Sequence, residues 1–236
     1  MARLDMSGLE VELRRSDRAR RARILVTAEG VEVVVPRRLA LAEVEPFVAE
    51  KRPWIERTLR RMREAEAERP GPRLEDGGHV PHLGEQLDLA VVVEPGRVRS
   101  HVGRRGEVLT VKVGRKGPDA VRDALEGWFR RRAREEIALR LDAATARAGV
   151  RYSGLQIRAQ RTRWASCSST GVMSFNWRLL VAPPEILDYV VEHEVCHLTV
   201  ADHSQRFWNL LESRMPGYRE HERWLKRHGP SLRLGP

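Results

Sequence analysis

Residues 190–198 decide the fold of the C-terminal half, and their sequence is Val190-Val191-Glu192-His193-Glu194-Val195-Cys196-His197-Leu198. The apolar residues in and before this stretch favour a buried helix. Residues four apart in a helix lie on one face, so His193 and His197 can bind one metal ion at about 2.0–2.1 Å each. Glu194 can then accept a proton from water, whose pKa zinc lowers to about 7. The stretch predicts a hydrolytic metal site.

A third histidine, His203, follows this stretch at the spacing of the three-histidine zincins. Metzincins place a glycine where this chain has Val200, so the chain must turn back to His203 in a different way. We predict one Zn²⁺ ion per chain bound by His193, His197 and His203, with Glu194 as the catalytic acid/base. Cobalt, nickel or manganese could occupy the same ligands.

Four further residues are candidates for substrate binding. Arginines flank a predicted strand at residues 172–177, and guanidinium groups bind carboxylate or phosphate groups through paired hydrogen bonds. Local salt bridges and packing against tryptophan are the alternative for these arginines. A tyrosine hydroxyl could stabilise an oxyanion, with packing at a helix start as its alternative. The four candidates are Arg161, Arg163, Arg178 and Tyr218. An edge strand near a zincin site holds an extended peptide, and we assign this part to residues 172–177.

The rest of the sequence predicts an α+β fold in two regions. Residues 1–117 form a β-rich N-terminal half with a long helix pair, because a helical period spans residues 41–67 and Pro53 is expected to kink or divide it. Residues 118–236 form a zincin-like helical half, in which the His-Glu-x-x-His helix accompanies a small antiparallel sheet. No internal repeat is visible. The expected strands are 9–13, 22–26, 31–35, 87–93, 108–113, 155–159 and 172–177, and the expected later helices are 118–148, 184–200, 205–214 and 218–227.

The composition excludes several classes of protein. The chain has 236 residues, with 43 Lys+Arg against 33 Asp+Glu, and a formal net charge of +10. No apolar run approaches the 18 residues typical of a membrane span. Two cysteines cannot form a disulfide framework, so a cytoplasmic location is the default expectation. The positive charge is compatible with a nucleic-acid partner. The densest basic segment contains Arg14, Arg15, Arg18, Arg20, Arg21 and Arg23.

Beyond the metal motif, several stretches resemble one family, the YgjP-like metallopeptidases, formerly a domain of unknown function and also labelled SprT-like or M48-type. The resemblance covers nearly the whole chain. The family's Trp-Gly-Ser-Cys is Trp164-Ala165-Ser166-Cys167 here. The resemblance implies a zinc-dependent hydrolase with the ligands and acid/base named above, and it supplies no substrate. The other stretches are 161–168, Asn176-Trp177-Arg178-Leu179, Ala182-Pro183-Pro184, His203-Ser204 and Phe207-Trp208.

Three functions are therefore open at this point. The first is a cytoplasmic zinc metallopeptidase that acts on a peptide or protein. The second is a metal-dependent nucleotide pyrophosphohydrolase, which would use the same site and hold a polyphosphate with the arginines at 161–178. The third is a DNA-associated SprT-like protease that binds nucleic acid through its basic N-terminal segment.

Overall fold

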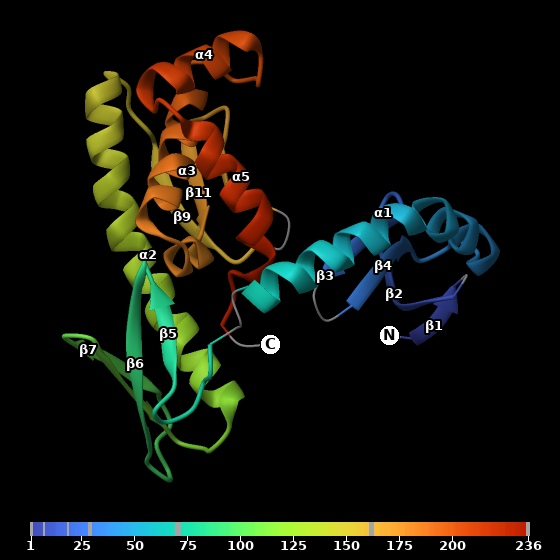
Figure 1. Cartoon of the computed structure of the whole chain (residues 1–236), viewed down its shortest axis with the longest axis horizontal. Helices are drawn as coiled ribbons and strands as arrows, with labels where there is room; N and C mark the ends of the chain where they lie inside the picture. The colour runs from blue at the N-terminus through green and yellow to red at the C-terminus, as the bar shows by residue number, and fades with distance from the viewer. Residues whose placement is uncertain are drawn as a thin grey trace. The chain divides into compact units, whose positions relative to one another are not determined.

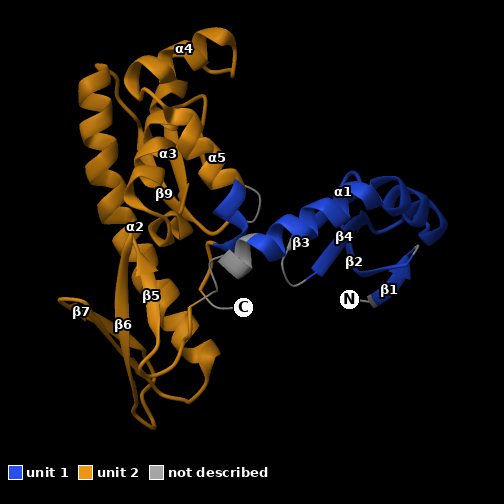
Figure 2. Ribbon diagram, viewed as in Figure 1, with its two compact units in different colours: residues 1–70, 227–231, 236 blue, residues 71–226, 232–235 orange. Residues whose placement is uncertain are grey.

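The computed structural model describes residues 2–6, 8–17, 19–27, 30–68, 72–160 and 163–234. The chain divides into two compact units, one of residues 1–70, 227–231 and 236, the other of residues 71–226 and 232–235 (Figure 2). The boundary expected at residue 117 lies inside the second unit, because residues 79–113 share one hydrophobic core with the helices that follow. In the described part of the chain, no helix combines the length and the apolar character that crossing a membrane requires.

The first unit is a four-stranded sheet with one helix. Its strands are β1 (Ala2–Met6), β2 (Leu9–Ser16), β3 (Arg23–Thr27) and β4 (Gly30–Pro36), and its helix is α1 (Leu41–Glu68). The spatial order is β1-β2-β4-β3, with β2 and β4 parallel. The core of this unit contains the alternate buried valines of β4 together with Val44, Val48 and Ile55 of α1. Pro46 and Pro53 lie inside one continuous helix, so Pro53 does not divide it.

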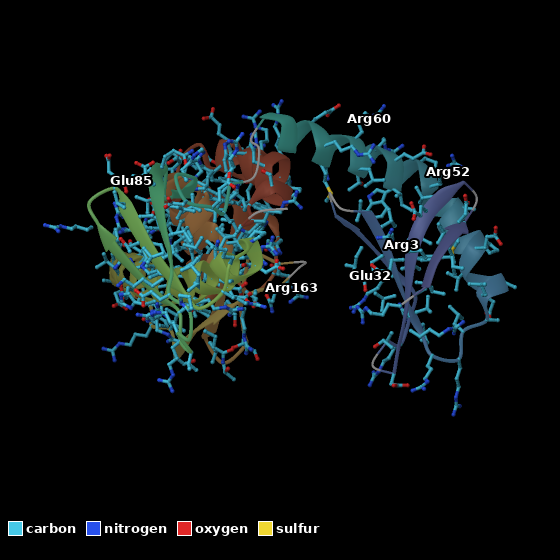
Figure 3. The ribbon with its side chains drawn as sticks, turned by 90° about the horizontal axis from the view of Figure 1, so that it is seen from below. Arg3, Glu32, Arg52, Arg60, Glu85 and Arg163 are labelled. Atoms are coloured by element: carbon cyan, nitrogen blue, oxygen red, sulfur yellow. The ribbon has the colours of Figure 1, made fainter. Side chains whose placement is uncertain are left out.

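Charged residues cover part of this unit's sheet. Arg3 is paired in register with Glu12, and Glu12 with Glu32, so the strands carry arginine and glutamate side by side (Figure 3). Arg14 forms an ion pair with Glu32. Acidic neighbours therefore offset part of the basic charge in the N-terminal segment.

A second arginine of the N-terminal segment is engaged by backbone. Arg15 donates hydrogen bonds from its guanidinium group to the carbonyl oxygens of Arg37 and Leu39, at 2.8 and 2.7 Å. Arg18 lies outside the described residues. Two arginines of the basic segment that was predicted to bind nucleic acid, Arg14 and Arg15, thus form contacts within their own unit.

The second unit begins with the same arrangement of strands. Strands β5 (His79–His82), β6 (Glu85–Val93), β7 (His101–Arg105) and β8 (Val108–Val113) precede helix α2 (Pro118–Ala148). Their order is β5-β6-β8-β7, and β6 and β8 are the parallel pair. The pattern of four strands and a helix therefore occurs twice, although the sequence shows no repeat, because what is repeated is the strand pairing.

A three-stranded sheet and three helices follow in this unit, and only the last two residues of the final helix, 227 and 228, are counted with the first unit (Figure 1). The strands are β9 (Gly154–Arg158), β10 (Ala165–Cys167) and β11 (Val172–Asn176), and the helices are α3 (Pro184–His197), α4 (Gln205–Arg214) and α5 (Tyr218–His228). The expected antiparallel sheet is in fact mixed. The central strand, β11, runs antiparallel to β10 and parallel to β9. Two short 3₁₀ helices, Trp177–Val181 and Gly229–Ser231, precede α3 and follow α5.

Candidate metal centre

The end of helix α3 carries two of the predicted ligands. Pro184 begins the helix, and His193 and His197 lie one turn apart near its end. The helix stops at His197, because the N–H groups of Thr199 and Val200 both donate to the carbonyl oxygen of Cys196 and turn the chain away. This turn replaces the glycine of metzincins and leads to His203, just before α4.

The structure brings the three predicted ligand histidines together. One ring nitrogen from each of His193, His197 and His203 lies within 4.8 Å of the other two. The Nε2 atoms of His193 and His203 are 3.0 Å apart. Burial and the two neighbouring rings lower the pKa of His193 to about 3, so its imidazole is neutral at pH 7. Neutral imidazole is the form that binds a metal.

His193 and His197 differ in the hydrogen-bond partner of Nδ1, the ring nitrogen that would face away from an ion bound at Nε2. His197 Nδ1 lies 3.1 Å from the carbonyl oxygen of Val200, an arrangement that places a proton on Nδ1 and leaves the Nε2 lone pair for a metal. His193 Nδ1 is buried and has no hydrogen-bond partner among the described residues. The three rings therefore fit a transition-metal ion, and the buried ring of His193 lacks the hydrogen bond that usually orients a metal-bound histidine.

Glu194 is a buried carboxyl group beside the histidines. Its side chain comes from α3, and only 5% of the residue is exposed. Burial raises the pKa of Glu194 to about 7, while the backbone N–H of Cys167 and the charge of Arg163 act in the opposite direction. The Oε2 atom has no hydrogen-bond partner in the described part of the chain. The carboxyl group can therefore both take and release a proton near neutral pH.

The structure separates the four candidates for substrate binding. Arg163 is near enough to Glu194 for its positive charge to lower the pKa of that carboxyl group. The Arg178 guanidinium lies 4.7 Å from the centre of the Trp177 ring, in the packing role that was the alternative for it. Arg161 lies outside the described residues.

Tyr218 lies in a row of three nearly parallel rings. Its ring stacks on Tyr189 and on Trp208, at centroid distances of 6.3 and 5.7 Å, and the residue is buried. Tyr189 comes from α3, one turn before His193, and the centroids of the two rings are 6.0 Å apart. Tyr218 therefore packs α5 against the site. Tyr189 was not predicted, although its helical spacing from His193 indicates the same face.

The strand beside the metal helix is β10, which was not predicted as a strand. The stretch assigned as the peptide-binding edge, residues 172–177, forms the central strand β11, which is paired on both sides. β10 is an edge strand of this sheet, it packs against α3, and its Cys167 donates the backbone hydrogen bond to Glu194. The assignment of the edge to 172–177 was wrong, because β11 inserts between its neighbours.

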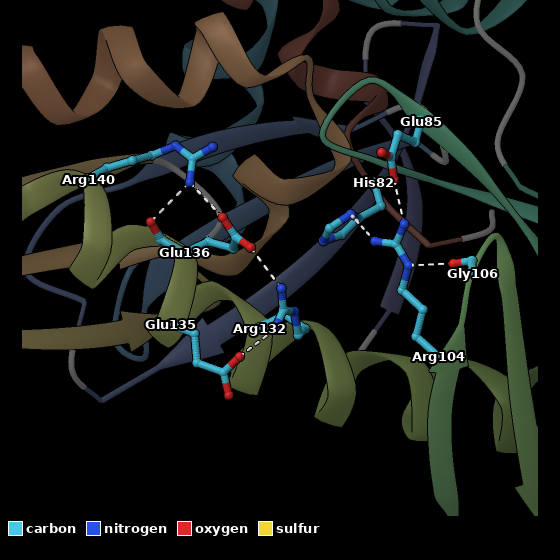
Figure 4. Close-up of polar contacts among 8 residues, drawn as sticks. All are labelled: His82, Glu85, Arg104, Gly106, Arg132, Glu135, Glu136 and Arg140. Carbon is cyan, nitrogen blue, oxygen red and sulfur yellow. Dashed lines mark hydrogen bonds and ion pairs between the residues drawn. The ribbon is translucent and has the colours of Figure 1, made fainter.

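Ion pairs tie α2 to the helix that carries the histidines. Arg140 of α2 donates to Asp188 of α3 at 2.9 Å, and Arg147 forms an ion pair with the buried Glu192. Arg140 also binds Glu136, which in turn pairs with Arg132 (Figure 4). These contacts fix α3 in position along α2.

The geometry can be compared with known proteins. A family model described as YgjP-like, metallopeptidase domain matches residues 20–228. The crystal structure of the metallopeptidase zymogen of Pyrococcus abyssi abylysin matches with 23% identity over 42% of this chain and 99% of that chain, with a TM-score of 0.36. The zymogen of Methanocaldococcus jannaschii jannalysin matches with 22% identity over 38% and 91%, with a TM-score of 0.34. No curated protein matches the chain. Both TM-scores are low, so only the family match bears on function.

Proposed function

Since the chain belongs to the YgjP-like metallopeptidase domain family, we propose that it hydrolyses peptide bonds with one metal ion bound by His193, His197 and His203. The observation that carries this proposal is the convergence of three imidazole nitrogens beside a buried carboxyl group. The metal that best suits three imidazoles in a hydrolase is Zn²⁺. When bound, such a cation acts as a Lewis acid that polarises a carbonyl group and lowers the pKa of water.

Glu194 is proposed as the residue that moves protons. Its Oε2 atom takes a proton from the attacking water and passes it to the nitrogen of the leaving amine. Burial supports this role, because a carboxyl group with a pKa of about 7 exchanges protons readily at neutral pH. The hydrogen bond from Cys167 supports it as well, because it anchors the carboxylate to β10.

The free edge of β10 is proposed to bind the substrate. An extended peptide can add to an edge strand through main-chain hydrogen bonds. β10 contains only Ala165, Ser166 and Cys167, small residues that leave the edge accessible. Arg163 precedes this strand and is near enough to Glu194 to lower its pKa, which supports a role in binding a carboxylate of the peptide or the oxyanion of the reaction.

Nucleotide hydrolysis is not proposed as a second function. A nucleotide polyphosphate would require several arginines around the metal ion to bind its phosphate groups. Arg178, one of the arginines expected in this role, instead lies over the Trp177 ring. A DNA-bound protease is not proposed either, because Arg14 and Arg15 are held by contacts within their own unit. The experiment below includes nucleoside triphosphates as alternative substrates.

The test compares wild type with the Glu194→Gln variant. Both should bind one equivalent of Zn²⁺, and only wild type should cleave a peptide library, with chelator abolishing the activity. Glu185→Gln, which changes an exposed carboxyl group on the same helix, is the matched control and should behave as wild type. Undiminished cleavage by Glu194→Gln would contradict the assigned role. Cleavage of nucleoside triphosphates without cleavage of peptides would contradict the proposed substrate.

A further inference from the structure

We propose that Phe207 is a positioning residue of the metal centre, whose ring holds the three histidine side chains in the arrangement that binds the ion. The inference rests on the proposed function, because it takes these histidines as the ligands. Phe207 lies in the first turn of α4 and is completely buried.

One phenylalanine ring contacts all three histidine rings. The centroid of Phe207 lies 4.9 Å from that of His193, 4.5 Å from that of His197 and 4.8 Å from that of His203. It meets His193 and His203 edge to face, at 66° and 64°, and stacks on His197 at 28°. Among the described residues, no other phenylalanine, tyrosine or tryptophan has ring contacts to the whole set.

The three histidines need this support to different degrees. His197 has its own restraint, since its Nδ1 atom is bonded to the carbonyl oxygen of Val200. His193 has no such bond, because its Nδ1 atom is buried without a partner in the described part of the chain. Metal-bound histidines are normally oriented by a hydrogen bond at this outer nitrogen. For His193, ring packing must provide the orientation that a hydrogen bond provides elsewhere.

His203 depends on packing for a different reason. It is exposed and belongs to the short segment between α3 and α4, so no helix fixes its backbone. Its ring is bounded by Phe207 and by Trp208, the latter at 5.5 Å and 32°. An exposed loop residue loses rotational freedom when it binds an ion. Packing that already restricts the ring before the ion binds reduces this entropic cost. Phe207 thus links the two helical ligands to the ligand in the loop.

The decisive comparison is between Phe207→Leu and Leu211→Ala in the full chain. Leucine keeps an apolar side chain at 207 but removes the ring. Leu211, one turn further along α4, is equally buried, so Leu211→Ala weakens the packing of α4 without changing the ring at 207. Three quantities are measured for each variant: Zn²⁺ affinity by competition with a chelator, the visible spectrum of the Co²⁺ form, and the thermal unfolding of the metal-free chain.

Phe207→Leu should weaken Zn²⁺ binding about tenfold or more, the range seen when outer-shell partners of ligands are removed. Its Co²⁺ spectrum should also change, because the ligand field depends on ring orientation. Leu211→Ala should lower the unfolding temperature while its Zn²⁺ affinity and Co²⁺ spectrum stay close to wild type. Phe207→Tyr, which keeps the ring, should retain wild-type affinity. Phe207→Met provides a second variant without the ring if the leucine variant does not fold.

Two results would overturn the inference. One is wild-type affinity and spectrum in the variants that lack the ring at 207. The other is an equal loss of affinity in Leu211→Ala, which would reduce Phe207 to ordinary packing. A wild-type chain that binds no Zn²⁺ would instead overturn the proposed function, and the inference with it.

Discussion

The Nε2 atoms of His193 and His203 lie 3.0 Å apart, although one residue belongs to α3 and the other to the segment after it. Two ring nitrogens at this distance repel each other through their lone pairs unless a proton or a cation lies between them. Burial keeps His193 neutral, so without an ion the two nitrogens share one hydrogen atom in a hydrogen bond, and a metal ion bound by both rings would replace that hydrogen. The pair is therefore poised to bind a metal ion.

The first prediction concerns the most exposed ligand. His203→Ala removes one of three donors, so Zn²⁺ affinity should fall by at least about 100-fold, at the upper end of the losses known for outer-shell partners alone. The measurement is competition with a chelator, followed by metal analysis after dialysis. His221→Ala is the matched control, because His221 contacts Tyr189 but does not belong to the ligand group. Stoichiometric, wild-type binding in His203→Ala would exclude this histidine from the site.

A second prediction concerns the ion pair that joins α2 to α3. Glu192 is buried, with 6% of the residue exposed, whereas the Arg147 side chain is largely exposed. Arg147→Met leaves a buried carboxylate without its partner and should cost about 1–3 kcal/mol of unfolding free energy. Glu192→Gln removes the buried charge itself and should cost less. Urea unfolding of the two variants and the double variant measures this order, and the reverse order would contradict it.

The features of the fold that depend on neighbouring residues could be predicted from the sequence. Apolar spacing and Pro184 predicted α3, and the histidine spacing indicated three side chains that the structure brings together. Local sequence does not predict structure that depends on contacts between segments far apart in the chain. Three small residues, Ala165 to Cys167, form a strand only because β11 lies beside them. The direction of β9 and the position of Phe207 against the histidines likewise depend on contacts between remote segments.

The compact units illustrate the same point. The sequence break near residue 117 is a real turn before α2, but β8 and α2 on either side of it bury their apolar residues in one core. The two cores divide instead near residue 70, where Pro70-Gly71-Pro72 forms a second break in the sequence pattern. Which of two breaks ends a unit depends on which apolar faces meet, and local sequence does not specify this.

A third prediction tests the contact between the second sheet and the start of α3. Gly84 has a φ of +86°, and a Cβ atom there would lie 3.2 Å from Pro184 Cδ. Gly106 has a φ of +62° and no atom within 4 Å of its Cβ position. Both alanine variants carry the strain of a left-handed backbone, about 1 kcal/mol or more. Gly84→Ala should be the more destabilising in urea unfolding, and equal losses would mean that the Pro184 contact adjusts without cost.

The last prediction concerns pH and a buried histidine far from the metal ligands in the chain. His82 is 3% exposed, and its ring packs against Trp128 and Phe129. Its Nδ1 atom faces Arg104, which Glu85 holds in an ion pair (Figure 4). Burial, together with Arg104 and Arg132, lowers the pKa of His82 from 6.5 to about 4, although Glu136 and Glu85 act the other way.

The direction of the pH effect is set by these pKa values. Between pH 6.5 and about pH 4 the unfolded chain binds a proton at His82 that the folded chain excludes. The stability due to neutral His82 is therefore complete above pH 6.5 and is lost as the pH falls toward 4, by at most roughly 3 kcal/mol. Carboxyl groups also titrate in this range, so the test is the difference between variants. Urea unfolding from pH 7 to pH 4 should show a smaller loss for His82→Leu than for wild type, whereas His79→Leu, an exposed position of the same strand, should follow wild type. Parallel curves for all three proteins would show that His82 does not contribute to the acid sensitivity of the fold.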